Sequence, residues 1–122
     1  MKFSLDKQED HIVVKLQEPK LNSLIAPIFK SEMILLNTEG IHNIILDLSD
    51  VSYCDSSGLS SLLVTNRLCK SGGGNFILAN IQPTVEKLIK ISQLETVFKI
   101  SKSVEEGVIF ALSGDTEGKL DN

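Results

Sequence analysis

Two nearly continuous apolar runs, residues 43–48 and 76–79, constrain the fold of this chain more than any other feature. Runs this short and this uniformly apolar are typical of parallel β-strands that are covered on both faces. Between them, leucines recur at helical spacing from about residue 57 to 71, and the triple glycine at 72–74 ends that pattern. A strand, a helix and a second strand in this order predict a parallel pair with a right-handed crossover.

The rest of the chain continues the same alternation. A β-branched run at 11–16 predicts a strand that forms a hairpin with an earlier strand at 3–5. Further on we expect helices at about 25–38, 83–91 and 104–112 and a short strand at 97–100. The sequence therefore predicts a single α/β domain with a mixed, mostly parallel sheet of four or five strands, about four helices and an N-terminal hairpin.

Proline, glycine and serine set the expected ends of the first helix. Residues 18–23 contain a proline and several turn formers, so we expect a loop there. Ser23 is a candidate cap for the helix that follows, Pro27 is tolerated only in its first turn, and Gly40 stops it.

The length of 122 residues suits one hydrophobic core, so we expect one domain over residues 1–113, followed by a flexible acidic tail at 114–122. No run approaches the roughly 18 apolar residues of a spanning helix, and the N-terminal residues lack the apolar core of a signal peptide. We therefore expect a cytoplasmic protein that does not insert into membranes. The net charge is -4 and the basic residues are scattered, which argues against a nucleic-acid partner.

Metal, redox and cofactor chemistry find little support. Cys54 and Cys69 lack a Cys-x-x-Cys or histidine pair nearby, so we interpret them as buried thiols and expect no disulfide in a reducing compartment. His11 and His42 fall at a strand start and a turn, and we expect both at the surface or a sheet edge. The triple glycine lacks the Gly-Lys-Ser/Thr ending of a phosphate-binding loop, so no cofactor is expected.

Asp47 and Asp50 flank one turn and suggest a carboxylate pair. A strand-end aspartate and a loop cap explain them as well, and no third metal ligand is visible.

The stretch Asp55-Ser56-Ser57-Gly58 places hydroxyls where a strand-to-helix turn enters the helix. Asp and Ser are common helix caps, so a purely structural role is one interpretation of Asp55 and Ser56. The amides and the positive dipole of a helix start also favour negative charge, so a phosphate on Ser56 can be accommodated without unfolding the helix. The two roles can coexist.

Residues 46–59, read as Leu-Asp-Leu-Ser-Asp-Val-Ser-Tyr-Cys-Asp-Ser-Ser-Gly-Leu, resemble the signature of STAS domains of the anti-sigma factor antagonist kind. The triple glycine, the strand-to-helix junction at 78–83 and the segment 91–94 resemble the same family in order and spacing. The resemblance extends from about residue 3 to 113 and implies an α/β STAS fold.

The resemblance also implies a switch. A partner serine-protein kinase phosphorylates the serine directly after the aspartate, which is Ser56 here, with Ser57 as a secondary position. The resemblance further implies that kinase recognition or partner binding involves Asp55, Ser56, Ser57, Gly58 and Asn22. The unphosphorylated form binds an anti-sigma factor, often the kinase itself, which then releases its sigma factor. A phosphatase of the PP2C type is a further candidate partner.

Two alternatives stay open. Where family members commonly carry a Gly-Glu-Leu-Asp turn, this chain has Glu18-Pro19-Lys20-Leu21-Asn22, with Asn22 near the position of the aspartate. A scaffold unit of a stress-sensing assembly, or an accessory subunit of a lipid-transport ABC complex, is therefore the main rival, without phospho-switching. An enzyme that uses Ser56 or Ser57 as a nucleophile is disfavoured, because Gly-x-Ser-x-Gly is absent and the chain has only two histidines.

Overall fold

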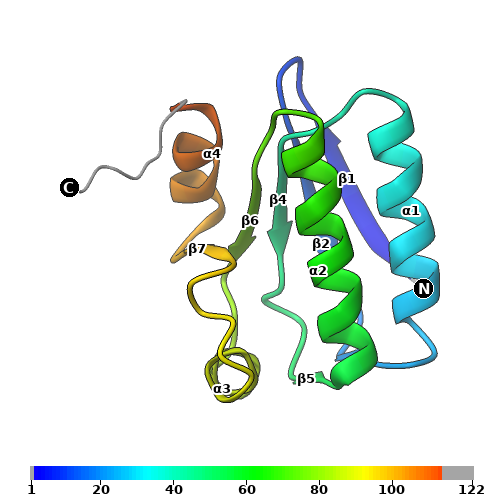
Figure 1. The fold of residues 1–122 in the computed structure, drawn as a ribbon, viewed down its shortest axis with the longest axis vertical. Coiled ribbons are helices and arrows are strands. Elements are labelled where there is room, and N and C mark those ends of the chain that lie inside the picture. The colour runs from blue at the N-terminus through cyan, green and yellow to red at the C-terminus, as the bar shows by residue number, and fades with distance from the viewer. Residues whose placement is uncertain (1, 114–122) are drawn as a thin grey trace.

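The computed structural model describes residues 2–113, and the expected tail at 114–122 lies outside these described residues (Figure 1). The strands are β1 (Phe3–Lys7), β2 (Ile12–Leu16), β3 (Lys20–Leu21), β4 (Ile44–Asp47), β5 (Tyr53–Cys54), β6 (Phe76–Ala79) and β7 (Lys99–Ser101). The helices are α1 (Ala26–Thr38), α2 (Ser56–Ser71), α3 (Pro83–Ile91) and α4 (Val104–Leu112).

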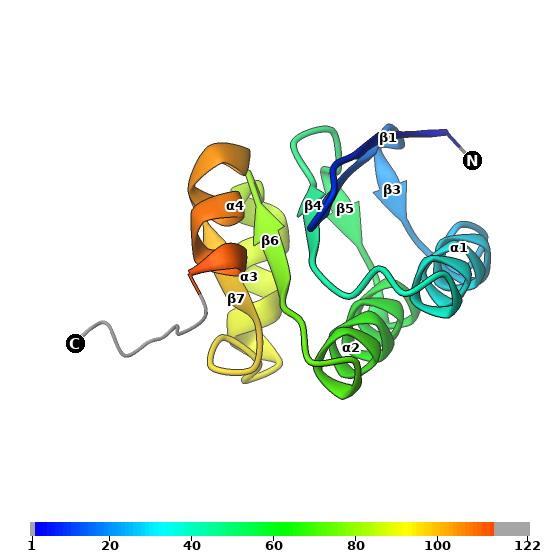
Figure 2. The same ribbon diagram turned by 90° about the horizontal axis from the view of Figure 1, so that it is seen from above.

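Five strands form the main sheet in the order β1-β2-β4-β6-β7. β1 pairs antiparallel with β2, whereas β2, β4, β6 and β7 pair in parallel. Helices α1 and α2 lie side by side on one face of the sheet, and α4 lies on the other (Figure 2). The predicted α/β class, mixed sheet, N-terminal hairpin and helix number are confirmed for the described part of the chain.

Strand alternation explains why the apolar runs are continuous. In β4, Ile44 and Leu46 belong to the large core cluster that contains residues of α1, α2 and α3, whereas Ile45 belongs to a smaller cluster with Ala111 of α4. Successive residues of a strand point to opposite faces, so a strand covered on both faces needs an apolar residue at every position. The prediction that these two strands are buried and adjacent is confirmed.

Three local predictions differ from the structure. Residues 18–23 were expected to be a loop, but Lys20 and Leu21 form β3, which pairs in parallel with β5 in a separate two-stranded sheet. Ser23 does not cap α1: the first turn is preceded by Ile25, and the Oδ1 atom of Asn22 accepts hydrogen bonds from the amides of Leu24 and Ile25. Two-residue strands carry too little periodicity to be recognised from sequence.

The third difference concerns the last strand, which covers Lys99–Ser101 and not 97–100. Other boundaries agree within one or two residues, including Pro27 in the first turn of α1 and Pro83 at the start of α3. Gly40, expected to stop α1, follows its end with φ +86°, a left-handed conformation that suits glycine.

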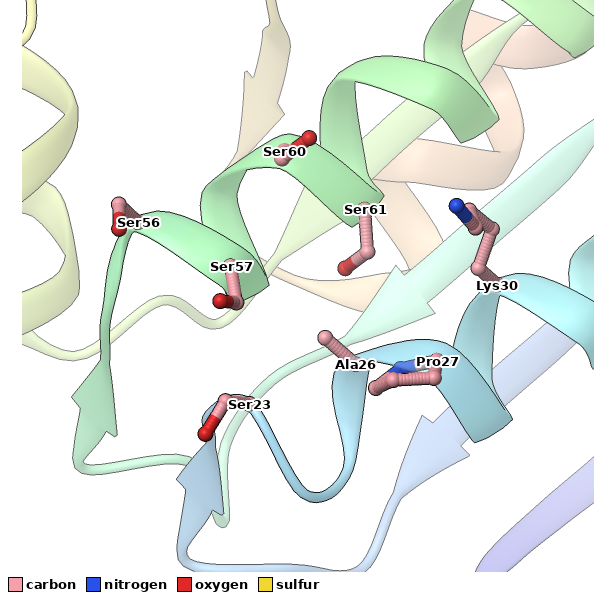
Figure 3. Close-up of a pocket in the computed structure, with 8 residues that line it drawn as sticks. All are labelled: Ser23, Ala26, Pro27, Lys30, Ser56, Ser57, Ser60 and Ser61. Carbon is pink, nitrogen blue, oxygen red and sulfur yellow. The ribbon is translucent and has the colours of Figure 1, made fainter.

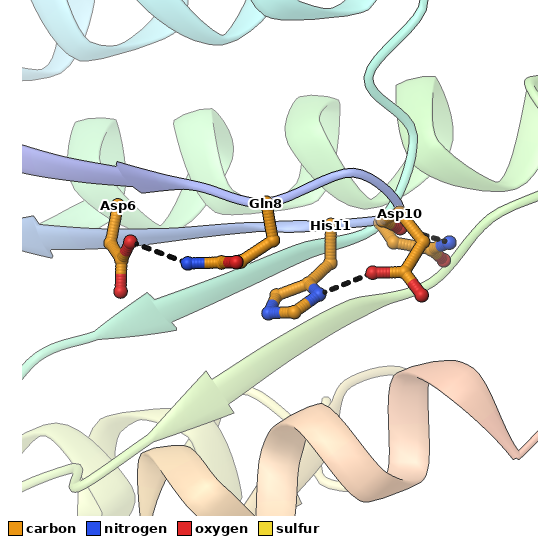
Figure 4. Close-up of polar contacts among 5 residues, drawn as sticks. Asp6, Gln8, Asp10 and His11 are labelled. Atoms are coloured by element: carbon orange, nitrogen blue, oxygen red, sulfur yellow. Dashed lines mark hydrogen bonds and ion pairs between the residues drawn. The ribbon is translucent and has the colours of Figure 1, made fainter.

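The histidines, expected at the surface or a sheet edge, are half-buried at one end of the sheet. His11 directly precedes β2, and its Nδ1 atom lies 2.9 Å from Oδ1 of Asp10 (Figure 4). His42 packs against the triple glycine: a Cβ built on Gly72 would lie 2.2 Å from Nδ1 of His42, and one on Gly74 would lie 2.1 Å from its carbonyl oxygen. The glycines therefore do more than end α2, because they let the chain before β4 approach it.

The core predicts a large cost for truncating the buried face of α2. Leu62 is fully buried between α2 and the sheet, so Leu62→Ala should lower the free energy of unfolding by about 2–5 kcal/mol. Leu24 is 77% exposed, and Leu24→Ala should change it by less than about 0.5 kcal/mol. Urea denaturation of both variants measures the difference, and equal effects would contradict the assigned core.

Candidate functional site

The serine turn, residues 55–58, connects β5 to α2 and lies at the same end of the molecule as the start of α1. Ser56 and Ser57 are the first two residues of α2. Both line a groove between the first turns of α1 and α2, together with Ser23, Ala26, Pro27, Lys30, Ser60 and Ser61 (Figure 3). The prediction that Ser56 lies at a helix start is confirmed, with the helix beginning at Ser56 and not at residue 57.

Asp55 is the cap of α2. Its side-chain Oδ1 accepts a hydrogen bond of 3.0 Å from the amide of Gly58, and its backbone is extended, as capping requires. Ser56 takes no part in this cap, although the sequence suggested both residues for it. Within residues 2–113, its exposed hydroxyl makes no hydrogen bond, so it is open to an approaching enzyme.

Gly58 lets β3 pass close to the first turn of α2. A Cβ at this position would lie 2.2 Å from the carbonyl oxygen of Leu21 and 2.8 Å from Sγ of Cys54. The amide of Asp55 also donates to that carbonyl oxygen of Leu21, at 3.3 Å. The absence of a side chain at Gly58 therefore allows the loop before α1 to lie against the serine turn.

Asn22, implied as a partner-binding residue, follows directly after this contact. It is half-buried, does not line the groove, and caps the loop that leads into α1. Asp55 and Asn22 are thus brought near each other by the Leu21 backbone, each fixing the start of one helix. Whether Asn22 also contacts a partner stays a prediction.

Ser57 differs from Ser56 in exposure. Ser57 is half-buried and Ser56 is exposed, although both line the groove at the start of α2 (Figure 3). Ser61 is buried deeper in the groove and donates a 2.6 Å hydrogen bond to the carbonyl oxygen of Gly58. The two candidate positions for phosphate therefore have different surroundings.

Sequence reasoning missed Ser23 and Lys30 as members of this groove. Both come from the α1 region, more than 25 positions before Ser57, and only the packing of α1 against α2 brings them near. Leu24, 77% exposed, and Tyr53, 50% exposed, lie on the segments that lead into α1 and α2. No local pattern marks any of these residues as part of a site.

The other candidates have structural roles. Oδ1 of Asp47 accepts from the amide of Ser49 and from Nδ2 of Asn80, so Asp47 fixes the end of β4. Cys54 and Cys69 are buried, as predicted, and burial raises the pKa of each thiol to about 12, with Asp55 adding to the effect at Cys54. In the described part of the chain, no three acidic, cysteine or histidine side chains gather as metal ligands.

The packing at Gly58 predicts a specific overpacking defect. Gly58→Ala gains helix propensity worth about 1 kcal/mol, but it forces the Leu21 carbonyl away and should lower the unfolding free energy by at least about 1 kcal/mol net. Ser60→Ala on the exposed side of the same helix is the control, expected within about 0.5 kcal/mol. Denaturant titration decides; a stabilised Gly58→Ala variant would show that β3 does not approach α2 this closely.

Solved structures share this fold. An anti-sigma factor antagonist from Mycobacterium paratuberculosis superposes with a TM-score of 0.77 at 18% identity, over 88% of this chain and 90% of that one. The Bacillus protein SpoIIAA in its phosphorylated form gives 0.68 at 24% identity, over 88% and 96%. Part of the murine anion transporter Slc26a9 gives 0.70 at 22% identity, over 88% of this chain but 18% of the transporter. At these identities the likeness concerns the fold.

Sequence similarity identifies the family. The anti-sigma-B factor antagonist of Bacillus subtilis is 32% identical over 83 residues, which cover 68% of this chain and 75% of that protein. The profile of the STAS domain matches residues 2–107, which include both helices of the groove and the whole serine turn. The resemblance carried by residues 46–59 is thereby confirmed: this chain belongs to the STAS domain family.

Proposed function

We propose that this chain is an anti-sigma factor antagonist that is switched by phosphorylation of Ser56. The observation that carries the proposal is the free, exposed hydroxyl of Ser56 beside a cap that Asp55 supplies alone. The similarity to the anti-sigma-B factor antagonist of Bacillus subtilis supports the same role. In this proposal the unphosphorylated protein binds an anti-sigma factor, which releases its sigma factor.

The switch requires one phosphoryl transfer. The Ser56 oxygen forms a bond to the γ-phosphorus of ATP, the bond to ADP breaks, and the hydroxyl proton leaves to solvent or to a base of the kinase. The product carries about -1.5 to -2 charges at neutral pH. Because Asp55 holds the helix start independently, this charge changes the surface without removing a hydrogen bond of the fold.

The surface around the serine turn suits a protein partner. Leu24 and Tyr53 are large, exposed side chains on the two segments that flank it, and Ile28 is 46% exposed on α1. Exposed apolar and aromatic side chains next to a polar centre are typical of protein interaction sites. A dianionic phosphate in the middle of such an interface would have to be desolvated or paired, which opposes binding.

The rival role as a scaffold or transport-associated STAS unit has the same fold, as the likeness to part of Slc26a9 illustrates. Fold alone therefore does not separate the two functions. The open Ser56 hydroxyl favours the phospho-switch.

No helix in the described residues is long and apolar enough to cross a membrane. We infer that residues 1–113 act as one regulatory domain in the cytoplasm, with a PP2C-type phosphatase reversing the modification.

Phosphorylation should occur at Ser56. A tagged copy of this protein is first used to capture the kinase from native cells. After incubation with that kinase and ATP, the protein should gain the mass of one phosphoryl group, as measured by intact-mass spectrometry. Ser56→Ala should abolish most of that gain, and Ser57→Ala should retain it. Equal modification of Ser56→Ala and the unchanged protein would refute the assignment.

Charge at Ser56 should weaken partner binding far more than it weakens the fold. Ser56→Asp adds a carboxylate at a helix start and should change the unfolding free energy by less than about 0.5 kcal/mol. In an interface the same charge should cost about 2–5 kcal/mol of binding free energy. Calorimetric titration with the purified anti-sigma factor and thermal melts separate the effects. Ser56→Ala, which adds no charge, should bind normally; equal affinities of both variants would exclude electrostatic exclusion as the switch.

A further inference from the structure

β1 is an edge strand of the main sheet, and no other strand of the described structure pairs with its outer side (Figure 2). Its ladder with β2 determines which backbone groups point outward. The amide of Gln17 donates to the carbonyl oxygen of Lys2, and hydrogen-bonded positions alternate along an antiparallel ladder. The backbone groups that point to the free edge are therefore those of Phe3, Leu5 and Lys7.

The side chain of Leu5 lacks the cover that the same face of the sheet has elsewhere. Leu5 lies opposite Val14, which is buried in the large core cluster, so Leu5 points to the face that carries α1 and α2. Even so, Leu5 is 46% exposed. In β1 only Phe3 is half-buried, and the four other residues are exposed. The helix layer therefore ends before the sheet does, and β1 extends beyond it.

α1 contributes a second apolar side chain on this side of the molecule. Glu39, directly after α1, forms an ion pair of 3.8 Å with Lys7, which places one flank of α1 beside β1. Leu35, one turn earlier on that flank, is 51% exposed. Lys30, which lines the groove of the serine turn, lies on the opposite flank of α1. Leu5 and Leu35 thus belong to an exposed surface that is separate from the serine turn.

The sequence of β1 is complementary to itself in one antiparallel register. When a two-fold axis at Ser4 relates two β1 strands, Lys2 of one protomer lies opposite Asp6 of its partner. Phe3 then lies opposite Leu5 of the partner, so apolar side chains meet on the helix side and opposite charges meet on the other face. With the axis at Asp6, two aspartates would face each other. With the axis at Leu5, Asp6 would face Ser4 and no opposite charges would be paired directly.

We propose that this chain forms a symmetric dimer in which two β1 strands pair about an axis at Ser4 and join the two five-stranded sheets into one. The pairing satisfies outward backbone groups of Phe3 and Leu5 in both protomers. The other edge strand, β7, is a poorer candidate, because it has only three residues and one of them is a lysine. The serine turn stays accessible, so this dimer does not depend on phosphorylation of Ser56.

The expected dimer is weak, because two short strands and a few side chains bury little area. Interfaces below about 1,200 Å² are typical of transient association, so we expect a dissociation constant of about 10–100 μM. Sedimentation equilibrium of the full-length chain measures it. The apparent mass should be that of a monomer at about 1 μM and should approach twice that value at about 1 mM.

Charge-swap variants assign the edge and the register. Asp6→Lys places lysines opposite each other on both sides of the axis and should raise the dissociation constant at least about tenfold. Adding Lys2→Asp to this variant restores opposite charges, and the double variant should dimerise as the unchanged protein does. Glu95→Lys is the matched control: it makes the same change in net charge at an exposed position between α3 and β7, and should have no effect. Ser56→Asp should likewise leave the dissociation constant unchanged.

Three results would overturn the proposal. The protein stays monomeric at about 1 mM; it dimerises, but Asp6→Lys dimerises equally well, so the second copy binds elsewhere; or the double variant, with native circular dichroism, does not recover the dimer. The measurement uses neither the kinase nor the anti-sigma factor. This proposal and the proposed function therefore fail separately.

Discussion

The rest of the structure depends on the burial of β4 and β6 on both faces. Ile44, Ile45 and Leu46 of β4 and all four residues of β6 are buried, beneath α1 and α2 on one side and α4 on the other. Neighbouring parallel strands must be joined by crossover connections, which are usually helices that cover a face of the sheet. Here α1, α2 and α3 connect β2 to β4, β4 to β6 and β6 to β7. The crossover helix α2 must then start at the carboxyl end of β4, which places the serine turn at that edge of the sheet. The position of the site thus follows from how the core is covered.

The small β3–β5 sheet turns this general position into a defined site. β5 immediately precedes Asp55, and its pairing with β3 draws the start of α1 towards the start of α2. Gly58 permits that approach because any side chain there would meet the Leu21 carbonyl. The two helix starts, the groove between them and the apolar side chains Leu24 and Tyr53 are therefore parts of one packed arrangement.

Strong periodicity made most of the fold predictable. The apolar runs of β4 and β6 are continuous, and the leucines of α2 recur at helical spacing. Both patterns indicate burial strongly enough to outweigh the secondary-structure propensities of single residues. The motif 55–58 likewise gave the position of Ser56 and its cap. β3, the capping by Asn22 and the membership of Lys30 in the groove were not predictable, because each depends on contacts between segments distant in sequence. His42 under the triple glycine belongs to the same class.

Two tasks fall on neighbouring residues here, because Asp55 caps α2 and Ser56 is the proposed acceptor of phosphate. In a serine that capped α2, phosphorylation would alter the oxygen that accepts the helix amide. Such a switch would couple the charge on the serine to the stability of the helix. Here Asp55 accepts the amide of Gly58 and Ser56 is left outside the cap. We therefore expect a new charge on Ser56 to act on a partner that approaches the surface and to leave the fold intact.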